Sequence, residues 1–137
     1  MASTPAFTTT PTAANVPTGN TIATANTAKN GTGTVVSVFT AGASGAKVDT
    51  ILFRALGTNV ATVARVFLNN GSTNATAANN VLIGEITLTA TTLSEVAALP
   101  AYEIPINRVI PAGYEINITI GTTVAAGYAI SAWGADL

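Results

Sequence analysis

The sequence predicts a single all-β domain, an antiparallel β-sandwich of about seven to eight strands in a jelly-roll-like arrangement. Three observations lead to this prediction. The length of 137 residues fits one domain, short β-branched or alternating stretches recur from Gly33 onward, and Gly, Asn and Pro turns separate them. An immunoglobulin-like sandwich is the alternative, because alternation along strands does not fix their order.

The first three strands are expected at residues 35–39, 48–56 and 60–68. The first is a run of β-branched and aromatic residues that ends in a Gly- and Ala-rich turn. The third stops at the Asn-Asn-Gly-Ser stretch at 69–72, where Asn and Gly tolerate the positive φ of a tight turn. A polar loop is then expected as far as Asn80.

The remaining strands are expected at 81–89, 102–106, 114–120 and 128–133, with 22–27 as a further candidate. Pro105 cannot donate to a strand ladder, so the strand at 102–106 is expected at a sheet edge or to end there. The stretch 92–99 is expected to be a loop or a short helical turn. Strict alternation predicts these core residues: Leu82, Ile86, Leu88, Tyr114, Ile116, Ile118 and Ile120.

Residues 1–33 form a compositionally distinct segment, and the sandwich domain is expected at 34–137. The segment is rich in Thr, Ala and Pro, and its only sizeable apolar side chains are Phe7, Val16 and Ile22. Because so few apolar groups cannot offset the entropy of ordering, we expect an extended arm. Either it is a disordered tail or it becomes ordered along a neighbouring subunit.

Two strands carry large apolar side chains on both faces. They are residues 51–56 and 63–68, whereas a strand in a free sandwich normally has one polar face. The outer faces are therefore expected to be covered, either by the chain's own loops and arm or by another subunit. The candidate interface residues are Phe7, Val16, Ile22, Leu52, Arg54, Arg65, Phe67 and Trp133.

The composition argues against an enzyme and against several classes of partner. The chain has no His and no Cys, and its five Lys or Arg and six Asp or Glu are scattered. We therefore expect no catalytic residues, no metal, no cofactor and no nucleic-acid partner. Glu85, Glu103 and Glu115 are interpreted as solvated strand faces. No membrane partner and no signal peptide are expected, because the chain lacks the apolar runs that both require.

Several stretches together resemble a group of small tailed-phage and prophage proteins. The resemblance covers roughly residues 20–137 and rests on Gly-Thr-Gly-Thr-Val-Val-Ser-Val-Phe-Thr-Ala-Gly-Ala-Ser-Gly at 31–45, Arg-Ala-Leu-Gly-Thr-Asn at 54–59, Arg-Val-Phe-Leu-Asn-Asn-Gly at 65–71, Leu-Ile-Gly-Glu at 82–85, Ile-Pro-Ala-Gly-Tyr at 110–114 and Ala-Trp-Gly-Ala-Asp-Leu at 132–137. Some members of the group resemble virion components.

The resemblance implies a capsid decoration, or cement, protein. Such a protein is similar to a jelly roll, forms a homo-oligomer (a dimer or a trimer) and binds the major capsid protein on the virion surface after synthesis in the host cytoplasm. No binding residue is carried over from the group. The alternatives are a receptor- or glycan-binding module of a tail fibre or adhesin, and a structural subunit of the tail or baseplate.

Overall fold

The computed structural model describes residues 10–14 and 21–137, with side chains from residue 21 onward. The regular secondary structure of the described residues consists of β-strands and one 3₁₀ turn, η1, at Ala77–Asn79. The strands are β1 (Thr10–Ala14), β2 (Thr21–Ile22), β3 (Val36–Thr40), β4 (Ala46–Ala55), β5 (Thr62–Asn69), β6 (Asn80–Leu88), β7 (Ala101–Ile110), β8 (Glu115–Ile120) and β9 (Tyr128–Asp136).

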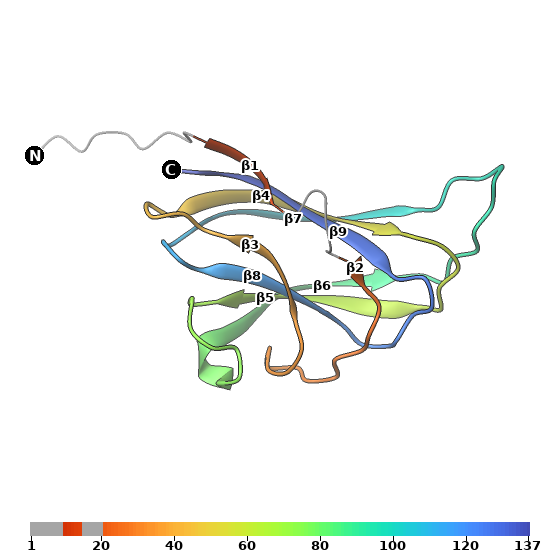
Figure 1. The fold of residues 1–137 in the computed structure, drawn as a ribbon, viewed down its shortest axis with the longest axis horizontal. Helices are drawn as coiled ribbons and strands as arrows, with labels where there is room; N and C mark the ends of the chain where they lie inside the picture. Colours follow the sequence, from red (N-terminus) through yellow and green to blue (C-terminus); the bar gives the residue numbers. More distant parts are fainter. Residues whose placement is uncertain (1–9, 15–20) are drawn as a thin grey trace, which may run out of the picture.

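The strands form two antiparallel sheets. Sheet A has the order β1-β9-β4-β7, with β2 also paired to β9, and sheet B has the order β3-β8-β5-β6. The sheets lie one above the other in a β-sandwich-like fold (Figure 1). The predictions of an all-β chain with two antiparallel sheets are confirmed. The prediction that the strand containing Pro105 is an edge is also confirmed, since β7 ends sheet A.

The core lies between the sheets and is built by alternation along each strand. In β8, Ile116, Ile118 and Ile120 are completely buried, and Tyr114 before them packs partly buried against the core. Ile51 and Phe53 of β4 are buried from the opposite sheet. Because side chains of successive strand residues point to opposite faces, these positions define the inner face of each sheet.

Glycine allows the turn at the end of β5. Gly71 has φ of +85°, a conformation that other residues rarely adopt. A Cβ there would lie 2.6 Å from the carbonyl oxygen of Gly113, so a larger residue would also clash. The Asn69 side chain accepts a hydrogen bond from the Gly71 N–H at 2.7 Å, as an Asx turn requires. The turn predicted at 69–72 is thus confirmed.

Part of the predicted N-terminal arm lies against its own chain. β1 and β2 both pair antiparallel with β9, and Ile22 is buried in the core. The segment after β2 donates from the Asn26 N–H to the Ile120 carbonyl and accepts at Ala23 from the Val124 N–H. The arm residues Phe7 and Val16 lie outside the described residues.

A register shift in β6 overturns one predicted core position. Val66 is opposite Gly84, but the next residue, Phe67, is opposite Leu82, so Ile83 is an extra residue. Such a bulge reverses the alternation beyond it. Leu82 is consequently 40% exposed, and its assignment to the core was wrong, whereas Leu88 is completely buried and Ile86 packs against the core. The stretch 92–99, expected to be a loop or a short helical turn, is a loop.

Candidate interaction surfaces

The outer face of sheet A brings together three of the candidate interface residues. Leu52 and Arg54 alternate with the buried Ile51 and Phe53, so they point away from the core. Trp133, on the neighbouring strand β9, is 45% exposed and lies opposite Thr50 of β4. This "sheet A outer face" comprises Thr50, Leu52, Arg54, Ser131 and Trp133.

The sheet A outer face presents an aromatic ring on a surface of small and polar side chains. The Trp133 Nε1–H donates to the Ser131 hydroxyl at 3.1 Å, which satisfies the indole nitrogen and fixes the ring. Thr50 donates to a Glu103 carboxylate oxygen at 2.8 Å. Arg54 is exposed and makes no ion pair within residues 21–137. The face can therefore pack an apolar surface on Trp133 and pair an acid with Arg54.

The outer face of sheet B is buried, although it faces away from sheet A. Phe67, Asn117 and Thr119 are almost inaccessible to solvent, and Arg65 is only 9% exposed. The register places Phe67 opposite Asn117 and Arg65 opposite Thr119, so the four side chains form a compact group. Arg65 and Phe67, predicted as interface residues, thus lie beneath the surface of the folded chain.

Two loops of the chain provide the cover. The segments 23–35 and 70–79 lie on the side of sheet B that faces away from sheet A (Figure 1). Asn74 joins them by donating to the carbonyls of Gly31 and Gly33 at 3.2 and 2.7 Å. Gly31 packs so tightly that a Cβ there would lie 2.6 Å from the Asn80 Cβ. Of the two expected kinds of cover, the chain's own loops therefore account for the burial of the apolar outer face of β5.

Buried polar groups under this cover are incompletely satisfied. The Arg65 Nε–H donates to Glu85 at 2.8 Å, but Arg65 Nη1, Asn117 Oδ1 and Thr119 Oγ1 have no hydrogen-bond partner. Buried polar atoms of this kind are commonly bridged by internal water. The group is better explained as an internal polar layer than as a ligand site.

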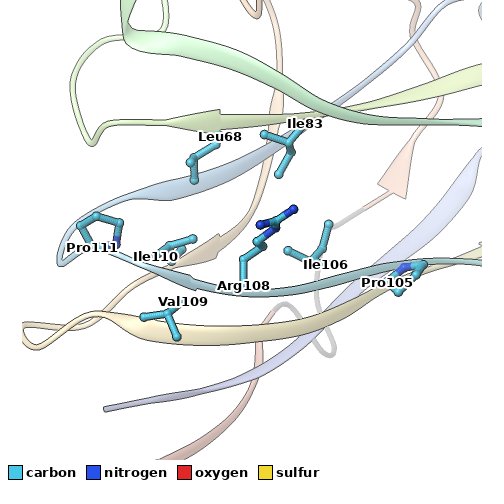
Figure 2. Close-up of a pocket in the computed structure, with 8 residues that line it drawn as sticks. All are labelled: Leu68, Ile83, Pro105, Ile106, Arg108, Val109, Ile110 and Pro111. Atoms are coloured by element: carbon cyan, nitrogen blue, oxygen red, sulfur yellow. The ribbon is translucent and has the colours of Figure 1, made fainter. Parts of the chain in front are cut away.

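A pocket of about 350 Å³ opens on the side of the molecule formed by the two edge strands, β6 of sheet B and β7 of sheet A. Figure 2 shows Leu68 and Ile83 on the sheet B side and the Arg108 side chain extending between them and Ile106. Its lining residues are Leu68, Ile83, Pro105, Ile106, Arg108, Val109, Ile110 and Pro111. The pocket is apolar apart from one guanidinium group. None of its residues except Arg108 offers a charge, and sequence reasoning did not single it out.

A buried polar network fastens the loops at one end of the sandwich. Asn59 exchanges backbone hydrogen bonds with Thr91 and uses its side chain to hold Ala126 and Gly127. The Tyr128 hydroxyl lies nearby and donates to the Thr89 carbonyl at 3.5 Å. Burial raises the pKa of Tyr128, with a further contribution from Tyr102, while hydrogen bonds with Asn59 and Thr91 oppose the increase. The predicted turn at Asn59 is thus also a structural anchor.

Among residues 10–14 and 21–137, no group of three or more acidic side chains lies close enough together to hold a metal ion. Within the same residues, no helix is long and apolar enough to cross a membrane. Comparisons with protein-family models, curated proteins and solved structures gave no match. Function must therefore be argued from the surfaces themselves.

Proposed function

We propose that this chain is a structural protein of a tailed-phage virion that decorates the capsid and stabilises the shell by bridging major capsid subunits. It would be made in the bacterial cytoplasm and act as a homo-oligomer, a dimer or a trimer, on the capsid surface. The observation that carries the proposal is the sheet A outer face, where Trp133 is exposed on a face built from the central strands β9 and β4. Tryptophan is enriched among the residues that contribute most to protein interfaces.

The strand pairing supports a jelly roll as the finer description of the fold. When β1 and β2 are counted together as the first strand, that strand pairs with β9, β3 with β8, β4 with β7 and β5 with β6. A long hairpin wrapped into two sheets produces this nested order. Jelly rolls of eight strands are common in viral capsid proteins, so the order agrees with a virion role without establishing it.

The mechanism would be burial of surface by packing. The described strands contribute few charges to the sheet A outer face, and the one nearby ion pair, between Lys47 and Asp49, is half-exposed and adds little. A stable interface buries about 800 Å² on each partner. Many identical weak contacts on one shell would then act together, because binding of one copy of an oligomer raises the effective concentration of the others.

The test uses the single tryptophan of the chain. The protein is labelled with 5-fluorotryptophan, and the one ¹⁹F resonance is followed while undecorated shells are added. We expect the resonance to shift or broaden and Trp133→Ala to bind the shell at least tenfold more weakly, whereas the exposed-loop control Val96→Ala binds normally. Electron microscopy of the same particles should place the protein on the capsid lattice. Density only on the tail, or undiminished shell binding by Trp133→Ala, would contradict the proposal.

A further inference from the structure

Two strand edges meet on the open side of the sandwich, and they differ in their ability to pair. β6 and β7 are the outermost strands of their sheets, and each pairs with one neighbour among the described residues. β7 is interrupted by Pro105, which has no N–H, and by Asn107, which has φ of +48°. β6 contains neither proline nor lysine. Thus β6 lacks the proline and lysine that often prevent another strand from adding to an edge, and its one irregularity is the bulge at Ile83.

The side chains of β6 also leave it open to an apolar partner. Val81, Leu82 and Ile83 are successive residues that are each at least 40% exposed. The one charged residue of the strand, Glu85, is held in an ion pair with Arg65 at 2.8 Å. The strand therefore combines unpaired backbone groups with uncovered apolar side chains, which is the chemistry that an added extended segment satisfies.

Arg108 limits which side chains an extended segment added to β6 can have. Its guanidinium group extends into the apolar pocket beside Ile83 and Ile106 (Figure 2). No acidic side chain forms a salt bridge with it within the described part of the chain. Arg108 itself is exposed, so its guanidinium group is accessible to a ligand and can hold a carboxylate through two parallel hydrogen bonds. An occupant that brings one acidic group is thus complementary to the pocket.

We propose that the β6 edge and the Arg108 pocket form one site, which binds an extended peptide segment of another protein by strand addition. The segment would continue sheet B beyond β6. Every second side chain of such a strand points toward the space between the sheets, where the pocket lies. The segment must therefore carry an acidic residue two positions from an apolar one, the acid for Arg108 and the apolar side chain for Ile83 and Ile106. The inference does not depend on where in a virion the protein resides.

A selection from a library of random dodecapeptides tests this chemistry without a known partner. The intact protein and Arg108→Gln are used as baits in parallel, with Lys29→Gln as the charge-matched control because Lys29 is an exposed cation in the segment 23–35, outside both the pocket and the sheet A outer face. We expect the intact protein and the control to enrich peptides with an acidic residue two positions from an apolar one. Arg108→Gln should lose that enrichment. Recovery of the same peptides by Arg108→Gln, or no enrichment, would overturn the proposal.

An enriched peptide is then synthesised with capped ends and titrated into ¹⁵N-labelled protein. The amide resonances of residues 80–88 and 105–111 should shift, and replacing the peptide's acid by its amide should weaken binding about two- to fivefold. N-methylation of alternate peptide backbone nitrogens should abolish binding. Three outcomes would refute the proposal: equal binding of the N-methylated peptide, equally tight binding of octanoate, which would indicate a small-molecule site, and self-association of the peptide-free protein through β6.

Discussion

The Asn59 side chain forms hydrogen bonds with both the N–H and the carbonyl of Gly127, which lies 68 residues further along the chain. Its Nδ2 donates to the Gly127 carbonyl at 2.9 Å, and its Oδ1 accepts from the Ala126 and Gly127 N–H groups at 2.8 and 3.0 Å. Asn59 also forms the backbone bridge with Thr91. Asn59 therefore ties the loop after β4 to the loop before β7 through its backbone and to the loop before β9 through its side chain.

We expect Asn59→Ala to lower the free energy of unfolding by about 2–4 kcal/mol, because it leaves buried backbone groups at Ala126 and Gly127 without partners. Urea denaturation measures the change. Asn30→Ala is the control, since Asn30 makes only exposed hydrogen bonds within its own turn. Equal effects of the two substitutions would mean that the buried Asn59 hydrogen bonds add no more to stability than exposed ones do.

Ile118→Ala should lower the free energy of unfolding by about 2–5 kcal/mol, the usual loss when a large buried side chain is truncated. Ile118 is completely buried in β8 at the centre of sheet B. Val96, which is 97% exposed, provides the control, and Val96→Ala should change stability by no more than about 0.5 kcal/mol. Thermal and urea denaturation both report the difference. A small effect at Ile118 would place the core on the other face of β8.

The stability of the fold should decrease in alkaline solution because of Tyr128. Its pKa in the folded chain is raised above the ordinary value of 10.0, chiefly by burial. The unfolded chain therefore loses the phenol proton first, and the free energy of unfolding falls as the pH rises above about 10. Tyr128→Phe should flatten this fall relative to the parent chain when both are melted between pH 8 and 11. Parallel curves for the two proteins would exclude Tyr128 as the source.

The two described ion pairs should contribute unequally. Glu85→Gln removes the partner of the largely buried Arg65, so we expect a loss of about 1–2 kcal/mol, below the full value for a buried pair because Glu85 is half-exposed. Asp49→Asn breaks the exposed pair with Lys47 and should cost less than about 0.5 kcal/mol. Denaturation in low and high salt distinguishes them. Equal losses would contradict the burial of Arg65.

The sequence predicted the strands better than it predicted which loops bury their outer faces. Strict alternation in β8 identified its buried isoleucines because one face of that strand meets the core and the other is polar. The bulge at Ile83 could not be read from sequence, since a one-residue insertion leaves the local pattern of apolar residues intact and only the pairing with β5 reveals it. Leu82 was therefore assigned to the wrong face.

The candidate interface residues were chosen by apolar patterning, which cannot tell self-cover from partner cover. Leu52 and Trp133 lie on the same open face, but Phe67 lies on a face covered by the distant segment 23–35 together with the loop 70–79 that follows β5. Those loops are polar and rich in Asn, Gly and Thr, so their composition did not indicate that they cover an apolar face. The open pocket was missed for a related reason: Arg108 looks like an ordinary strand charge until β6 and β7 are placed on the same side of the sandwich.

The central position of β9 has a consequence for synthesis of the protein. β9 lies between β1 and β4 and contributes the buried Tyr128, Ile130 and Ala132, yet it is synthesised after all the other described strands. Until then β1 and β2 have no partner strand, and the edge of β4 that faces away from β7 is uncovered. Sheet A should therefore form completely only after β9 has been synthesised, and the uncovered edge of β4 should leave the partly made chain prone to aggregation until then.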